Sequence, residues 1–182
     1  MKRIIIAIVL ALMAVVASAS VPVTLSTDTG EIHGTRSVPD NASRTAVLII
    51  AGSGPTDRNG NSSVTGIATN TYKMLADSLA ARGYASLRYD KRGIAASVAA
   101  GADESQLTFE AYIDDAAAWA EWLAADERFD RVVLAGHSEG GLIALVAAKR
   151  SDKVVAVVTL AGVGESIDAT LRRQLGTQPE PY

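Results

Sequence analysis

The 182-residue sequence contains no cysteine and only two histidines, His33 and His137. Without cysteine, the chain can form neither a disulfide nor a thiolate-ligated metal site. The two histidines do not form the H-x-x-H or H-E-x-x-H spacing of a catalytic zinc site. We therefore predict no metal site, and no feature of the sequence indicates another cofactor.

The sequence also has no excess of positively charged residues. The chain carries 17 Lys and Arg against 20 Asp and Glu, for a net charge of −3. Because no basic patch stands out, nucleic acid is not an expected partner. The apolar share of 48% and the charged share of 20% are ordinary for a globular protein. The length is enough for one hydrophobic core.

The longest apolar run is short and lies at the N-terminus. Two basic residues, 2–3, precede the apolar run 4–16, and three small residues, 17–19, follow it. This order is typical of a secretory signal peptide, and we predict cleavage after Ala19. A membrane anchor is the alternative, but the run is shorter than the roughly 20 residues of a membrane-spanning helix. We predict a secreted or periplasmic protein without a stable membrane anchor, whose domain begins at residue 20.

Strand-like and helix-like segments alternate along the rest of the chain. A β-hairpin is expected from the runs 21–25 and 32–38. Further strands are expected at 45–51, 84–89, 131–135 and 153–161, and helices at 71–82, 109–123 and 141–150. Asn70 and Gly83 are the expected cap residues of the first helix, and Thr108 is expected to cap the second. Residues 52–70 read as a long polar loop. This alternation predicts an α/β protein with a mostly parallel sheet.

The segment Gly136-His137-Ser138-Glu139-Gly140 follows an apolar strand and precedes an apolar helix. It matches G-x-S-x-G, in which a serine sits at the apex of a sharp strand-to-helix turn, the nucleophile elbow. A plain glycine-rich turn and a dinucleotide-binding turn are the alternatives. The second would need glycine at position 138, where this chain has serine. We therefore predict Ser138 as a nucleophile.

A serine nucleophile needs backbone N–H groups that stabilise the oxyanion formed during attack. One is expected from Glu139, directly after the nucleophile. The other is expected from the loop after the strand 45–51, which begins Gly52-Ser53-Gly54-Pro55. We predict that the N–H of Ser53 is the second donor.

Four motifs at successive strand ends carry a resemblance. The sequence reads GSGPTDRNG at 52–60, RYDKRG at 88–93, GHSEGG at 136–141 and LAG at 160–162. Together they resemble a group of bacterial α/β-hydrolases that includes esterases, lysophospholipase-like and serine-aminopeptidase-like hydrolases. The resemblance covers roughly residues 21–170 and implies the α/β-hydrolase fold, of which this chain would hold the first six strands. One departure is Ala95, where the group usually has glycine.

The resemblance also implies residues that have no position in this chain. In the family, the catalytic acid follows the seventh strand and the catalytic histidine follows the eighth. We expect both beyond residue 182, and residues 165–182 as a possible start of a cap insertion. Of the histidines present, we expect a packing role for His137, with its side chain directed away from Ser138. We expect His33 to be an exposed residue of the hairpin.

Four charged residues in the matched loops, Asp57, Arg58, Asp90 and Arg92, are expected to brace those loops. For Asp57 and Arg58, shaping the pocket and pairing with each other are both open.

The first functional hypothesis is an exported serine hydrolase that cleaves small carboxylic esters. Its alternative is a non-catalytic, truncated or decayed homologue, or a binding module. The sequence does not determine the oligomeric state.

Overall fold

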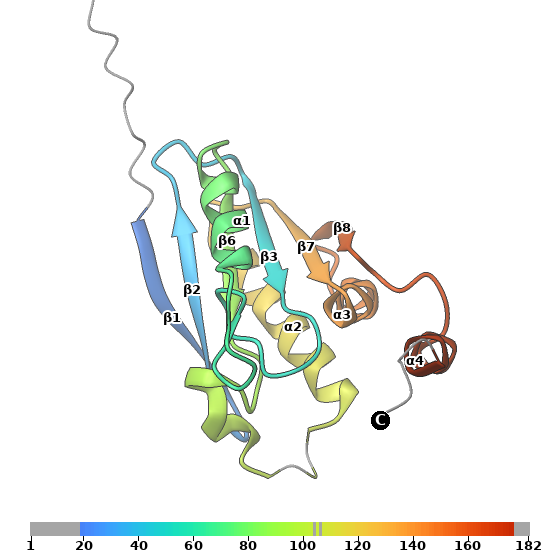
Figure 1. Ribbon diagram of the computed structural model, residues 1–182. Coiled ribbons are helices and arrows are strands. Elements are labelled where there is room, and N and C mark those ends of the chain that lie inside the picture. The colour runs from blue at the N-terminus through green and yellow to red at the C-terminus, as the bar shows by residue number, and fades with distance from the viewer. Residues whose placement is uncertain (1–18, 104, 106, 177–182) are drawn as a thin grey trace, which may run out of the picture.

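The computed structural model describes residues 19–103, 105 and 107–176 (Figure 1). The predicted signal peptide falls almost wholly outside the described residues, which begin with Ala19 at the start of the first strand. Residues 177–182, part of the expected cap start, also lie outside them.

Six strands form one sheet in the order β1-β2-β6-β3-β7-β8. Their bounds are β1 Ala19–Thr27, β2 Gly30–Val38, β3 Thr45–Ile50, β6 Ala85–Tyr89, β7 Arg131–His137 and β8 Val154–Leu160. The β1–β2 hairpin is antiparallel, β2 runs antiparallel to β6, and the pairs from β6 to β8 are parallel. The predicted hairpin and mostly parallel sheet are therefore confirmed.

In the described part of the chain, three α-helices connect strands and a fourth follows β8. They are α1 Thr71–Ala80, α2 Phe109–Ala124, α3 Glu139–Ala147 and α4 Ile167–Gly176. Short 3₁₀ helices cover Ala95–Gly101 and Ala148–Arg150. The segment predicted as a long loop also holds a small second sheet of β4 Asn61–Ser62 and β5 Ile67–Ala68. Two-residue strands are too short to leave a periodic signal, which is why the sequence did not indicate them.

The helix caps test the local predictions. Thr108 Oγ1 accepts a hydrogen bond from the N–H of Ala111 at 3.1 Å, as predicted. Gly83, at φ 80°, ends α1 in the left-handed conformation, and the N–H of Tyr84 reaches the carbonyl of Leu79 at 3.0 Å. Asn70 is the N-cap residue of α1, as predicted, and its carbonyl accepts from the N–H of Met74 at 2.8 Å, but its side chain makes no capping hydrogen bond. Its amide oxygen instead accepts from the side chain of Asn61 at 3.0 Å, which ties the end of the loop to β4.

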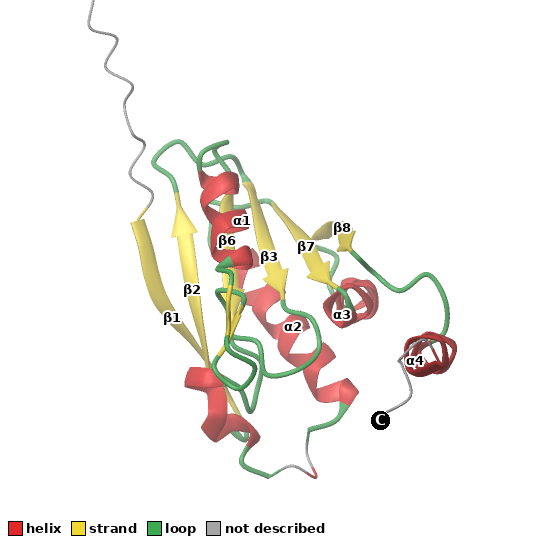
Figure 2. Cartoon of the chain, in the orientation of Figure 1, coloured by secondary structure: helices red, strands yellow, loops and turns green. Residues whose placement is uncertain are grey.

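The sheet is covered on both faces, as a parallel sheet requires. Figure 2 shows α1 on one side of the sheet and α2 on the other. Along β3, Leu48 and Ile50 belong to the core beneath α2 and α3, whereas Val47 and Ile49 pack with α1. This division follows from the alternation of side chains along a strand. No helix in the described part of the chain is long and apolar enough to cross a membrane.

The strand β8 lies at one end of the six-stranded sheet, and within the described residues it pairs only with β7. Three of its apolar side chains are exposed: Val155 by 55%, Val158 by 45% and Leu160 by 36%. The described structure therefore leaves an apolar strand with one free hydrogen-bonding edge.

Candidate active site

Ser138 stands between the last residue of β7 and the first residue of α3. Its backbone has φ 52° and ψ −118°, a conformation that is rare for a residue with a side chain. Its N–H donates to the carbonyl of Leu160 at 2.8 Å, and its carbonyl accepts from the N–H of Gly141 at 2.9 Å. These two bonds hold the strained turn, and the predicted elbow geometry is present.

Two glycines allow the elbow to pack closely. A Cβ on Gly136 would lie 2.0 Å from the carbonyl oxygen of Gly140. A Cβ on Gly140 would lie 2.5 Å from the carbonyl oxygens of both Ile50 and Ala51, at the end of β3. Neither position can accept a side chain without moving backbone, so β7, α3 and β3 meet at a spacing that only glycine permits.

We expect Gly136→Ala to lower the free energy of unfolding by about 3 kcal/mol or more, because overpacking against backbone cannot be relieved by a rotamer change. Urea denaturation followed by circular dichroism measures this change. The matched control is Gly164→Ala, since a Cβ there meets nothing within 4 Å. An equal effect of the two substitutions would contradict the close-packing argument.

A cavity of about 270 Å³ opens at the carboxyl end of β3 and β7 and contains Ser138. It is lined by Gly52, Ser53, Thr56, Gly60, Thr69, Thr71, Tyr72, His137 and Ser138. The structure therefore brings together Ser53 and Ser138, which are 85 positions apart in the numbering of the chain. Gly52 is in close contact with the elbow, since a Cβ there would lie 3.3 Å from Cβ of Ser138.

The two predicted oxyanion donors are unused within the described residues. Neither the N–H of Ser53 nor that of Glu139 donates to another described group. Glu139 is the first residue of α3, so its N–H lies at the positive end of the helix dipole. An oxyanion hole requires free N–H donors beside the nucleophile, and Ser53 lines the same cavity as Ser138.

Neither histidine hydrogen-bonds to Ser138 in the described structure. Nδ1 of His137 lies 3.0 Å from the hydroxyl of Tyr72, and the ring packs against that of Tyr72. The packing role is therefore confirmed. His137 nevertheless lines the same cavity as Ser138, although its side chain was expected to point away from that serine. His33 lies on β2, separated from β7 by β6 and β3. It is half-buried rather than exposed, because its ring contacts Thr24 on the paired strand β1.

The charged residues of the matched loops act as braces. Asp90 accepts from the N–H of Arg58 at 2.7 Å and from that of Ala96 at 3.2 Å, and burial raises the pKa of this carboxyl. Arg92 forms a buried ion pair with Asp115 at 2.5 Å. The expected bracing role of these loop residues is thus confirmed.

Asp57 and Arg58 do not pair with each other. Asp57 accepts from the N–H groups of Asn59 and Asn61 at 2.8 and 2.9 Å, which closes its own loop. The charged partner of Arg58 is Asp90, at 3.4 Å. Sequence proximity suggested the first pairing, but the loop after β6 places another carboxylate against Arg58.

Ala95, which departs from the family's usual glycine, has φ 46°. The loop therefore demands a left-handed residue at this position, and alanine adopts that conformation against its steric preference. The backbone at position 95 therefore has the left-handed conformation that a glycine there would favour.

Two further residues at the site were not identified from the sequence. Lys91 is 3% exposed and donates to the carbonyl of Gly52 at 2.8 Å and to the carboxylate of Glu139 at 2.9 Å. The hydroxyl of Tyr72 accepts from the N–H of Gly52 at 3.0 Å. Lys91 lies within the RYDKRG segment, two positions after the end of β6, and this place near a strand end was the signal in the sequence that could have indicated a role at the site.

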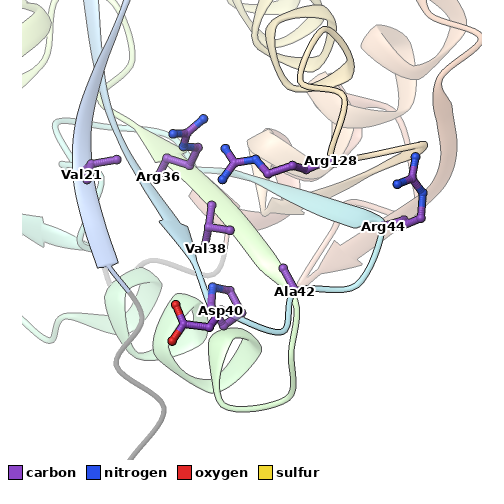
Figure 3. A pocket seen from close by; sticks show the side chains of 8 residues that line it. Val21, Arg36, Val38, Asp40, Ala42, Arg44 and Arg128 are labelled. Atoms are coloured by element: carbon purple, nitrogen blue, oxygen red, sulfur yellow. The ribbon is translucent and has the colours of Figure 1, made fainter.

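A larger cavity of about 590 Å³ lies at the opposite end of the sheet, near the end of β2 and the start of β3 (Figure 3). Its arginines are already paired with carboxylates. Arg36 and Arg128 both contact Asp126, at 3.1 and 2.5 Å, and Arg44 pairs with Asp130. Within the described residues, no group of three His, Asp or Glu is placed to hold a metal ion. The cavity with Ser138 is therefore the candidate active site.

Comparison with known proteins identifies the family and the fold. The family described as serine aminopeptidase, S33 matches residues 66–172, which include Ser138 and Glu139. A dienelactone hydrolase from Anabaena variabilis is similar in structure, with a TM-score of 0.63 and 24% identity over 80% of this chain. An esterase from Pyrococcus furiosus matches with a TM-score of 0.65 and 20% identity over 90% of this chain. An α/β-hydrolase from a Penicillium species matches with a TM-score of 0.65 and 20% identity over 86% of this chain. No curated protein matches the sequence.

These similarities confirm the predicted α/β-hydrolase fold. The chain spans 64%, 60% and 50% of the length of the three solved structures, in the order bacterial hydrolase, archaeal esterase and fungal hydrolase. The match therefore covers only part of each of those proteins.

Proposed function

The chain belongs to the serine aminopeptidase family of α/β-hydrolases, and we propose that it is a serine hydrolase that cleaves carboxylic esters through Ser138. The observation that carries the proposal is the strained conformation of Ser138 at the β7–α3 turn. The unused N–H groups of Ser53 and Glu139 beside it support the same role. The preference for an ester follows from the likeness to an esterase and a dienelactone hydrolase.

In the proposed reaction, Ser138 Oγ attacks the ester carbonyl carbon and a base takes the hydroxyl proton. The carbonyl oxygen becomes an oxyanion, which the N–H groups of Ser53 and Glu139 stabilise. Each such donor contributes about 3–4 kcal/mol to transition-state stabilisation. The tetrahedral intermediate then collapses to an acyl-enzyme as the alcohol leaves with the proton, and water releases the acid in a second step.

We propose that the catalytic histidine and acid follow residue 182 in the complete protein. Two observations support this. Neither His33 nor His137 hydrogen-bonds to Ser138, and the chain spans at most 64% of the solved structures named above. The coding sequence downstream of Tyr182 tests it: a continuing frame with a late histidine agrees, and a stop codon favours the alternative of a non-catalytic homologue.

A fluorophosphonate probe tests the nucleophile directly. In the protein that carries the histidine, the probe is expected to modify Ser138 and no other serine, as mapped by peptide mass spectrometry. An elbow serine with a base and an oxyanion hole is the most nucleophilic hydroxyl in such a protein. Modification of a different serine would refute the assignment of Ser138.

We also propose that the protein is exported, because a basic start, an apolar run and three small residues precede Ser20. N-terminal sequencing of material from the periplasm or the medium is expected to begin at Ser20. The proposal fails if the protein is recovered from the cytoplasm with Met1 in place.

A further inference from the structure

Gly52 is held on both sides by buried side chains. Its N–H donates to the hydroxyl of Tyr72 at 3.0 Å, and its carbonyl accepts from Nζ of Lys91 at 2.8 Å. Tyr72 is 6% exposed and Lys91 is 3% exposed. Both backbone groups of the residue before Ser53 are therefore fixed by partners from outside the loop.

The same two side chains also bind the elbow. The hydroxyl of Tyr72 lies 3.0 Å from Nδ1 of His137, and Nζ of Lys91 lies 2.9 Å from the carboxylate of Glu139. His137 and Glu139 are the two residues that flank Ser138. Two bridges thus connect Gly52 to the elbow, one on each side of the nucleophile.

The bridge through Lys91 acts on a peptide group that the reaction needs. The carbonyl of Gly52 and the N–H of Ser53 belong to one planar peptide unit, so holding the carbonyl also sets the direction of the N–H. A cationic donor at the carbonyl polarises the unit and makes its N–H a stronger donor. Lys91 therefore acts on both the direction and the strength of the proposed Ser53 donor.

Lys91 has no open path to the substrate. Besides its two hydrogen bonds, its ammonium group lies 5.0 Å from the centre of the Tyr112 ring, and Lys91 does not line the cavity of Ser138. It consequently acts through Gly52 and Glu139 rather than on the reacting atoms.

The bridge through Tyr72 runs through a single hydroxyl group. Burial raises the pKa of the Tyr72 hydroxyl, so this group stays protonated at neutral pH. Its oxygen accepts from the N–H of Gly52 and lies within hydrogen-bond distance of Nδ1 of His137, at 3.0 Å. The elbow histidine is thereby used as an anchor for the oxyanion loop.

We propose that Lys91 and Tyr72 are positioning residues of the oxyanion hole, which tie Gly52 to the two neighbours of Ser138 and so fix the N–H of Ser53 relative to that of Glu139. The inference rests on the proposed function. It adds two residues, neither of which touches the substrate, to the machinery of that reaction.

The test compares Lys91→Met and Tyr72→Phe with the unaltered protein that carries the triad histidine. The matched control is Lys73→Met, which removes an exposed ion pair with Asp77 on α1. Hydrolysis of a p-nitrophenyl ester is measured per active site, counted by fluorophosphonate titration. Affinity for phenylboronic acid, which places a tetrahedral anion on the serine, is measured alongside.

For Lys91→Met we expect kcat per active site to fall about tenfold or more, with KM changed less than about threefold, since the loss of a whole oxyanion donor costs about 10²–10³ in kcat. The affinity for the boronic acid should fall by a similar factor. Tyr72→Phe should act in the same direction, and Lys73→Met should leave both quantities unchanged. A purely structural role would lower the number of titrated sites without lowering the rate of each site.

If Lys91→Met fails to fold, Tyr72→Phe decides the question, because it removes only one hydroxyl. The inference is overturned if each folded variant keeps kcat and boronic acid affinity within about twofold of the unaltered protein, well short of the loss expected for an impaired donor. Failure of the proposed function gives a different result, in which the unaltered protein itself is neither labelled at Ser138 nor active.

Discussion

Replacement of Ser138 by alanine is expected to abolish ester hydrolysis in the protein that carries the triad histidine. Removal of the nucleophile from a serine hydrolase lowers kcat by about 10⁶-fold. The fold should survive, because the substitution deletes one hydroxyl that makes no hydrogen bond to another described residue. The measurements are p-nitrophenyl ester hydrolysis and thermal unfolding by circular dichroism.

Ser78→Ala is the matched control, since Ser78 is exposed on α1, away from the cavity. It should retain full activity and full labelling by the fluorophosphonate. Hydrolysis that persists in Ser138→Ala at more than a small fraction of the original rate would show that another group is the nucleophile. The elbow would then be a structural turn.

Residues 20–182 expressed alone are expected to show negligible esterase turnover. The described structure offers Ser138 no hydrogen-bonded histidine, because His137 is bound to Tyr72 and His33 lies on β2. Oxyanion stabilisation and substrate binding without the triad leave only about 10³–10⁴-fold acceleration over water. Turnover of a p-nitrophenyl ester near that of the longer protein would show that one of these two histidines is the base.

The same material is expected to self-associate through β8. This strand has one free edge in the described structure, and Val155, Val158 and Leu160 are exposed on it. An apolar, uncharged edge strand pairs readily with other chains. Size-exclusion chromatography should show large species, and Val158→Lys should increase the monomeric fraction. A soluble monomer of the unaltered segment would contradict this prediction.

The chain's local patterns were sufficient for most of the fold. Alternation and apolar runs located the hairpin and the strands, and Thr108 and Gly83 marked helix ends, because these signals depend on neighbours within a few positions. The elbow was also local: glycine, serine and glycine at fixed spacing between a strand and a helix specify one turn. Asn70 shows where local patterns fail to predict a contact. Its side chain could hydrogen-bond either to the first turn of α1 or to Asn61, and in the structure it bonds to Asn61.

What the sequence alone determined is therefore the strained strand-to-helix turn with Ser138 at its apex, the serine that we propose as the nucleophile. Tertiary structure decided which distant side chains meet there. Lys91 reaches Gly52 across 39 positions, and Tyr72 reaches His137 across 65, only because the sheet order places β6, β3 and β7 side by side. Such contacts leave no period or spacing in the chain, since they depend on strand order and on which carboxyl ends share an edge. The elbow serine could be predicted from its sequence neighbours, but the side chains that hold the adjacent loop at Gly52 could be recognised only in the folded protein.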